Sequence, residues 1–145
     1  MSSALAAAGS DAPQPGVFMI SLDFELRWGT RDSIPLDRYR RNVLGARLVI
    51  PRLVAAFAAS GVHATWATVG FLFFDWKDEL LASLPAVQPK YTNPALSPYP
   101  DLAALGANER EDPYHFGRSL VREIASHPGQ EIGTHTRSEE RRVGR

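Results

Sequence analysis

Two short apolar segments of the chain each end in side chains that can bind a metal ion. Asp23 and Glu25 close the first segment, residues 17–25, and His135 follows the second, residues 130–134. Residues two apart on an extended strand project from the same face, so the two carboxylates should lie side by side. One imidazole and two carboxylates suit zinc, although other first-row divalent ions would also fit. The spacing therefore predicts a divalent metal site, with zinc as the first choice.

Such a site needs strands that deliver these side chains to one place. A third apolar run, Ala64-Thr-Trp-Ala-Thr-Val-Gly70, lies between the two segments and predicts a strand over residues 63–69. Parallel strands of an α/β fold end at one edge of the sheet, where active sites are built. We therefore expect an α/β fold with three parallel strands that carry Asp23, Glu25 and His135 at a common rim.

The connections between these strands carry helical signals. Apolar spacing predicts a helix over 44–59, stopped at Ser60-Gly61 and kinked or divided at Pro51. Two shorter helices are expected over 76–84, with Asp75 as the cap, and over 117–126. Six of the eleven prolines fall in residues 85–113, which predicts an extended surface excursion there rather than a long helix or a central strand.

The strand motifs, taken in order, resemble those of the polysaccharide deacetylase (NodB-homology) family. They are Ser21-Leu-Asp-Phe-Glu, then Ala64-Thr-Trp-Ala-Thr-Val-Gly, then Glu131-Ile-Gly-Thr-His-Thr. The resemblance covers residues 17–136 and implies the N-terminal portion of a deformed (β/α) barrel, truncated after about three strands. It also implies a metal-dependent hydrolase that acts on carbon–nitrogen bonds other than peptide bonds, deacetylating an N-acetylated sugar or polysaccharide precursor.

The resemblance also implies roles for individual residues. Asp23 matches the family's catalytic base, and His135 matches its first metal-binding histidine. Phe24 stands where the family has a second aspartate, so Glu25 is the candidate for the carboxylate ligand. Because the carboxylates of Asp23 and Glu25 share a face, their roles could be exchanged. The family's second histidine should fall four residues after His135, at a position that is Glu139 here.

The sequence divides into three parts. Residues 1–16 are rich in Ala, Ser, Gly and Pro and should form a flexible tail, and residues 17–136 should form a partial deacetylase-like domain. Residues 137–145 look like the in-frame translation of a sequencing adapter, so we interpret them as non-native. On this interpretation the later motifs of the family are missing, and the 145-residue chain should be inactive and poorly stable because its strand edges are unpaired.

Four residues outside the metal site are candidates for binding substrate. Arg27 and Trp28 lie in the loop after the first strand, on the side where parallel barrels bind substrates. Tyr114 and His115 follow the proline-rich excursion, which we interpret as a substrate-binding flap. For Trp28, packing in the core is the competing interpretation. The remaining histidines, His63 and His127, should lie at the opposite end of the sheet and be structural.

Composition limits the partners. Sixteen basic and sixteen acidic residues cancel, and no basic stripe favours nucleic acid. The chain has no cysteine, which excludes disulfides and thiolate metal sites. We expect no membrane span, because we find no apolar segment near ~20 residues. The N-terminus carries no evident signal peptide, so a cytoplasmic location is expected.

Two other classes of function compete with the deacetylase interpretation. A glycoside hydrolase also uses paired carboxylates, but these flank the scissile bond at roughly 5 to 9 Å and need no histidine beside them. A non-catalytic carbohydrate-binding or interaction module would be favoured if the full-length gene also lacked a histidine four residues after His135. Removal of metal by a chelator separates the first alternative from the deacetylase, because only the deacetylase depends on a metal.

Overall fold

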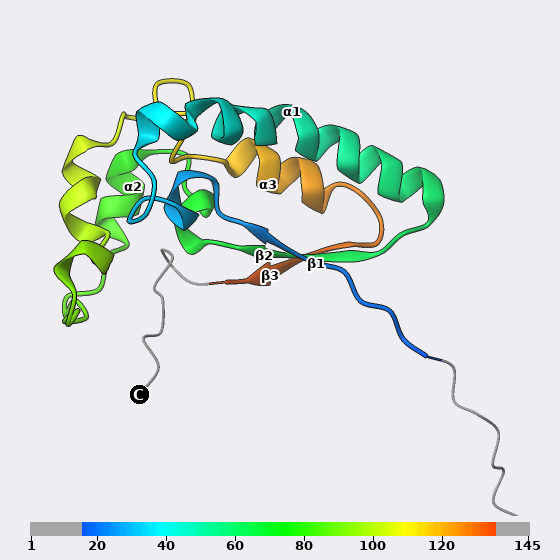
Figure 1. Ribbon diagram of the computed structural model, residues 1–145, viewed down its shortest axis with the longest axis horizontal. Helices are drawn as coiled ribbons and strands as arrows, with labels where there is room; N and C mark the ends of the chain where they lie inside the picture. The colour runs from blue at the N-terminus through cyan, green and yellow to red at the C-terminus, as the bar shows by residue number, and fades with distance from the viewer. Residues whose placement is uncertain (1–15, 136–145) are drawn as a thin grey trace, which may run out of the picture.

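The computed structural model describes residues 16–135, and these form a mixed α/β structure (Figure 1). Its sheet contains three parallel strands in the order β1-β2-β3: β1 (Ser21–Phe24), β2 (Ala64–Thr68) and β3 (Gln130–Thr134). In the register, Asp23 lies beside Ala67 and Ala67 beside Gly133. The predicted strands are thus confirmed, although β1 is shorter than expected because residues 17–19 are exposed and unpaired.

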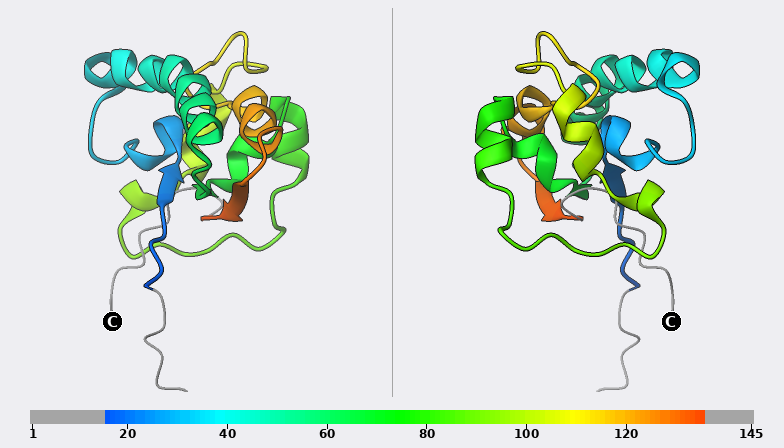
Figure 2. Two further views of the ribbon diagram at one scale, coloured as in Figure 1. Left: turned by 90° about the vertical axis from the view of Figure 1, so that its right-hand side faces the viewer. Right: turned by 90° about the vertical axis from the view of Figure 1, so that its left-hand side faces the viewer.

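Two helices, α1 (Leu36–Ser60) and α3 (Arg118–Ala125), cover one face of the sheet (Figures 1 and 2). The strands present Phe24, Trp66 and Thr68 to these helices, and all three are buried. The alternate positions, among them Asp23, Thr65 and Glu131, point the other way. No helix of the described part of the chain covers that second face. The sheet is therefore one-sided, with an apolar face under the helices and a polar face left open.

Helix α1 begins at Leu36, two turns before the predicted start. Residues 36–42 carry mostly charged and polar side chains, so they give no apolar periodicity, but Pro35 immediately before them sets the N-terminal boundary. Pro51 lies inside the helix and does not divide it. The predicted end is confirmed, since Gly61 adopts a left-handed conformation (φ 62°) and its N–H donates to the carbonyls of Phe57 and Ala58.

Helix α1 also bears on the expectation that the chain has no membrane span. By length and composition alone, α1 is long and apolar enough to cross a bilayer, although the sequence predicted no apolar segment of that length. The helix packs Val43, Ile50 and Val54 against the rest of the fold, but only 17% of its apolar window is buried, and one such helix is weak evidence for a membrane span. The absence of a membrane span therefore stays a prediction.

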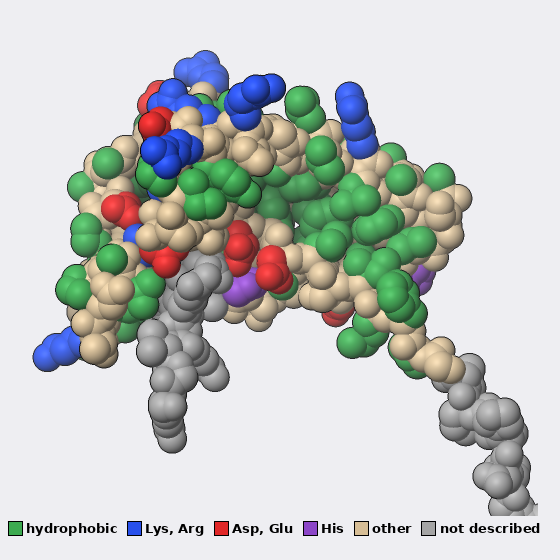
Figure 3. All heavy atoms as spheres, viewed as in Figure 1, with side chains coloured by type: hydrophobic (Ala, Val, Ile, Leu, Met, Phe, Trp, Pro, Cys, Tyr) green, Lys and Arg blue, Asp and Glu red, His purple; other side chains and the backbone are tan. Residues whose placement is uncertain are grey.

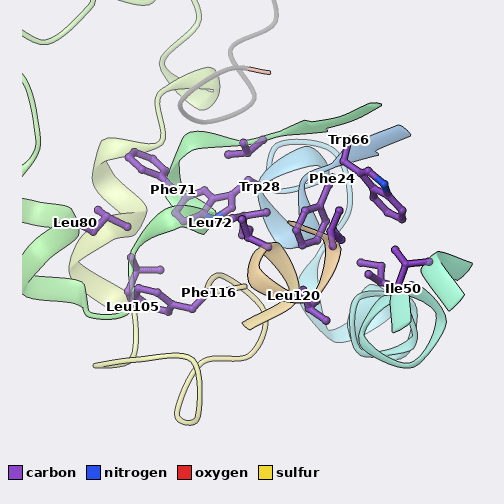
Figure 4. Close-up of a cluster of buried hydrophobic side chains, with 14 of the residues drawn as sticks. Phe24, Trp28, Ile50, Trp66, Phe71, Leu72, Leu80, Leu105, Phe116 and Leu120 are labelled. Atoms are coloured by element: carbon purple, nitrogen blue, oxygen red, sulfur yellow. The ribbon is translucent and has the colours of Figure 1, made fainter. Parts of the chain in front are cut away.

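The core lies between the helices and the sheet and extends past the strand ends (Figure 4). Trp28 and Phe71 lie at its centre with ring centroids 4.8 Å apart, and neither side chain is exposed. Both come from short 3-10 helices that directly follow strands, η1 (Leu26–Gly29) after β1 and η2 (Gly70–Phe73) after β2. The segments that follow the strands are thus anchored by their own aromatic side chains.

The region between α2 (Lys77–Ala82) and α3 contains only short 3-10 helices, η3 (Pro94–Leu96) and η4 (Tyr99–Ala104). This confirms the prediction that no long helix or central strand forms here. The segment is not only a surface excursion, however, because Leu102 and Leu105 are buried in the core. The predicted cap of α2 is wrong: Trp76 occupies that position, and Asp75 forms ion pairs with Arg118 and Arg122 of α3.

Arg47 of α1 binds the C-terminal end of the region between α2 and α3 through hydrogen bonds and an ion pair. Its guanidinium donates to the carbonyls of Pro113 and Phe116 and pairs with Glu109 at 2.5 Å. Hydrogen bonds from Arg47 and Ser119 lower the pKa of Glu109 although burial alone would raise it. The tail expected over residues 1–16 and the non-native segment expected over 137–145 lie outside the described residues, except Gly16.

Candidate metal centre

The candidate centre is built where β1 and β3 end, on either side of β2. Asp23 is the third residue of β1, Glu25 follows its last residue, and His135 follows the last residue of β3. The backbone N–H of His135 donates to the carbonyl of Thr68 at 3.1 Å, which extends the β2–β3 pairing to the histidine. The parallel register therefore brings residues more than a hundred positions apart to one edge.

The three side chains are close to one another. His135 Nε2 lies 3.1 Å from Glu25 Oε1 and 3.9 Å from Asp23 Oδ1. One donor atom from each residue can be chosen so that all three lie within 4.8 Å of one another. Acidic and histidine side chains meet on the same surface in Figure 3. The convergence predicted from the strand ends is thus present in the structure.

The three side chains differ in exposure. Side-chain exposure is 19% for Glu25 and 22% for His135, but 65% for Asp23. Glu25 and His135 therefore form a sheltered pair, while Asp23 lies at the rim where water has access. This difference favours Glu25 over Asp23 as a metal ligand, a choice that the shared strand face left open.

The donor set and spacing fit a small divalent ion. Two donors on a tetrahedral zinc, with bonds of roughly 2.0 to 2.1 Å, lie about 3.3 Å apart. The His135–Glu25 separation of 3.1 Å is close to this value, whereas the His135–Asp23 separation of 3.9 Å and the 4.8 Å limit for all three atoms exceed it, so Asp23 would have to move closer to share the ion. The set is generic, because nitrogen and oxygen donors suit several first-row ions.

Two residues that the sequence did not single out shape the position of Glu25. Leu26 has a positive φ of 49°, an uncommon conformation for a residue with a side chain, and it turns the chain sharply after β1. Gly29 lies against the Glu25 carboxylate: a Cβ at position 29 would stand 1.9 Å from Glu25 Oε2. The glycine was visible in the sequence only as a loop residue.

The structure corrects the expectation that Arg27 and Trp28 contact substrate. Trp28 is fully buried, and its indole N–H donates to the carbonyl of His115 at 2.8 Å. Arg27 is 9% exposed and donates to the carbonyls of Thr30, Arg31 and Ile34. Burial lowers the pKa of Arg27. Both side chains hold the segment after β1 in place and offer no surface to a ligand.

Tyr114 and His115, the other two candidates, are half-buried and engaged within the fold. His115 Nδ1 lies 2.9 Å from the carboxylate of Asp112, and its ring packs edge-on against Trp28. The Tyr114 ring lies under the guanidinium of Arg40, 5.6 Å from ring centroid to Cζ. Substrate binding by these two residues stays a prediction. His63 and His127 precede β2 and β3 respectively, at the opposite end of the sheet from His135.

Comparison with known proteins adds no assignment. No protein-family model, curated protein or solved structure matches this chain. The resemblance to polysaccharide deacetylases therefore rests on the three motifs and on the site they form.

Proposed function

We propose that this chain carries the metal site of a metal-dependent hydrolase acting on carbon–nitrogen bonds other than peptide bonds. The proposed reaction is removal of an acetyl group from an N-acetylated sugar or polysaccharide precursor. The observation that supports it is the convergence of Asp23, Glu25 and His135 at the carboxyl edge of a parallel sheet. This is the edge at which parallel barrels place their catalytic groups.

The arrangement suggests a division of labour. His135 and Glu25, sheltered and 3.1 Å apart, would hold the ion, which when bound supplies Lewis acidity for the carbonyl oxygen and for the attacking water. Asp23 is more exposed and lies on the same face. Its carboxylate oxygen would accept the proton of the water, a contribution of roughly 10² to 10⁴ in rate.

We further propose that the sheet is the first part of a deformed (β/α) barrel. Parallel strands in sequential order, with the helices of residues 16–135 on one face of the sheet only, support this proposal. The open face, which carries Asp23, Thr65 and Glu131, would then line the interior of the barrel. On this proposal further catalytic groups belong to later strands, and the 145-residue chain should bind metal without turning over substrate.

The two alternative functions are weaker proposals. Paired carboxylates in a glycoside hydrolase stand on opposite sides of a sugar ring, whereas Asp23 and Glu25 both lie within 4 Å of one imidazole nitrogen. A non-catalytic binding module would be favoured if the full-length gene also lacked a histidine four residues after His135, since Glu139 lies in the segment interpreted as non-native.

Zinc titration tests the proposal. Calorimetry should show one zinc per chain, reversed by EDTA, and His135→Ala should weaken binding by at least about tenfold because one of the two proposed ligands is lost. His63→Ala is the matched control, since that histidine lies at the other end of the sheet and should leave affinity unchanged. Equal binding by the wild type and His135→Ala would rule out this centre.

A second measurement addresses the substrate. An oligomer of N-acetylglucosamine should shift the NMR signals of the His135 ring in the zinc-loaded chain, because the acetamido group approaches the ion. The Glu25→Gln variant, which should load zinc poorly, should not respond. A sugar-induced shift that is independent of zinc would instead support a non-catalytic binding module.

A further inference from the structure

Helix α1 leaves most of its surface uncovered in the described part of the chain. Its buried residues lie on one side: Val43, Ile50 and Val54. At 3.6 residues per turn, positions 41, 48 and 52 project in roughly the opposite direction, away from the sheet. We define the outer face of α1 as the exposed charged and large apolar residues on that side: Arg38, Arg41, Leu44, Leu48, Val49 and Arg52. The outer face is therefore open to a partner outside residues 16–135.

The apolar part of the outer face is continuous. Leu48 is 67% exposed and Val49 is 55% exposed. Leu44 lies one turn before Leu48, so the two side chains are neighbours on the helix surface. Figure 3 shows apolar and basic side chains together along the top of the molecule, over α1. The helix thus offers an apolar strip to a partner and not a single exposed side chain.

The arginines of the outer face are not used inside the fold. Arg38, Arg41 and Arg52 make no hydrogen bond or ion pair with any other described residue. Arg47 of the same helix, by contrast, pairs with Glu109. No acidic residue follows the second position of α1. The outer face therefore carries three positive charges without an ion-pair partner in the described residues.

We propose that the outer face of α1 binds the surface of an anionic lipid bilayer, with the helix lying in the plane of that surface. The guanidinium groups pair with lipid phosphates, and Leu48 and its apolar neighbours enter the boundary between headgroups and acyl chains. Each basic residue near an anionic surface contributes about fivefold in affinity, so three contribute about a hundredfold. The helix lies on the membrane and does not cross it, and the inference does not depend on the proposed hydrolase function.

The combination of positive charge and apolar surface favours a bilayer over other partners. The phosphates of a nucleic acid would pair with the arginines but would offer no apolar surface to Leu48 and Val49. A second copy docked through the same face would bring arginines together, with no carboxylate of that face to pair with them. An anionic bilayer supplies both negative charge and an apolar interior.

This orientation turns the candidate metal centre toward water. The helices cover one face of the sheet, and Asp23 projects from the other (Figure 2). Acidic and histidine side chains accordingly lie below the helix layer in Figure 3, away from the outer face of α1. A protein bound through α1 would keep the centre accessible to a hydrophilic molecule.

Flotation with lipid vesicles tests the proposal in the 145-residue chain. Vesicles that contain phosphatidylglycerol should carry the protein up a density gradient, and pure phosphatidylcholine vesicles should bind at least about tenfold more weakly. High salt should release the protein, because it screens the arginines. Flotation excludes aggregates, which sediment. The assay contains no metal, so its result is independent of the candidate metal centre.

Variants of the outer face identify the surface that binds. Arg41→Gln combined with Arg52→Gln should weaken binding to anionic vesicles by about 25-fold, at about fivefold for each charge. Leu48→Gln should weaken it by at least about fivefold, because apolar burial is lost. Lys90→Gln is the matched control, since this exposed base lies in the proline-rich region, away from α1 (Figure 1). All four positions are exposed, so the circular dichroism spectra should match the wild type.

Four results would overturn the proposal. The first is equal binding to both kinds of vesicle, or binding that no outer-face variant reduces. The second is binding to single-stranded DNA at the same affinity as to anionic vesicles, with no effect of Leu48→Gln on either. The third is a dimer that Leu48→Gln dissociates in protein that does not float with vesicles. The fourth is vesicle-bound protein that resists extraction at alkaline pH, which would mean that α1 crosses the bilayer.

Discussion

At the scale of single residues, the candidate centre depends on how Glu25 is held. The strand ends at Phe24, and Leu26 turns the chain with its positive φ, so Glu25 is left between a strand and a 3-10 helix. Its carboxylate then packs on Gly29 and faces His135 at 3.1 Å. Groups that orient a metal ligand commonly affect metal affinity by roughly 10- to 100-fold. We expect Gly29 to have this role here through the space it leaves for the Glu25 carboxylate.

Gly29→Ala should therefore weaken zinc binding about tenfold. The added Cβ would meet Glu25 Oε2 at 1.9 Å, and the flexible carboxylate should move away from His135 rather than the backbone unfolding. Calorimetric zinc titration measures the loss, and a thermal melt should show a largely unchanged fold. Gly45→Ala is the matched control, because a Cβ there meets no atom within 4 Å and α1 should gain roughly 0.5 to 1 kcal/mol. Unchanged zinc affinity in Gly29→Ala would refute this role of Gly29.

At the scale of elements, the segment from Gly106 to Phe116 holds the central tryptophan in place. Asp112 is nearly buried and accepts hydrogen bonds from the Gly106 N–H and from His115. The backbone carbonyl of His115 in turn accepts a hydrogen bond from the indole N–H of Trp28, and the His115 ring packs against the indole. Burial alone would raise the pKa of Asp112, but the hydrogen bonds and charge of His115 and the backbone N–H groups lower it overall.

This lowered pKa predicts a dependence of stability on pH. The folded-state pKa lies below the ordinary 3.8, so the ionised carboxylate contributes stability above about that pH and loses it as the pH falls through the folded value. Urea unfolding should show Asp112→Asn destabilised by roughly 1.5 to 3 kcal/mol at pH 6. The gap to the wild type should narrow below pH 3.8. Asp78→Asn, at an exposed position, serves as the control. A gap independent of pH would contradict the proposed role of the Asp112 carboxylate.

At the scale of the whole molecule, the described sheet has helices on one side only. Its outer strands, β1 and β3, each pair with β2 alone, and exposed sheet edges with an uncovered face stabilise a fold poorly. Residues 17–19 add exposed apolar surface beside β1, since Phe18 and its neighbours are more than 80% exposed. Both features suggest low stability and a tendency to associate.

We accordingly expect the 145-residue chain to unfold over a broad temperature range. In scanning calorimetry the van't Hoff enthalpy should fall below the calorimetric enthalpy, because the unpaired edges allow parts of the sheet to open separately. Phe18→Lys should reduce concentration-dependent association in light scattering without shifting the midpoint. A single sharp transition with equal enthalpies would contradict the predicted instability.

Many helix and strand positions could be predicted from the local pattern of apolar residues and turn residues. β2, the end of α1 at Gly61 and the position of α3 agree with the sequence to within one or two residues. The start of α1 and the cap of α2 differ from the prediction. The first turns of α1 are polar and therefore show no apolar periodicity. Asp75 does not cap α2 because it pairs with Arg118 and Arg122. The spacing of residues within one segment cannot predict an ion pair with a residue more than forty positions away.

The sequence by itself determined which side chains stand at the strand ends, since strand residues alternate between faces and Asp23, Glu25 and His135 directly adjoin apolar runs. Only the tertiary structure decided that Glu25 rather than Asp23 is the nearer partner of His135 and that Trp28 and Arg27 face inward. The physical reason is that distances between strand ends and the burial of a loop depend on packing between distant segments. Spacing along one segment contains no information about that packing.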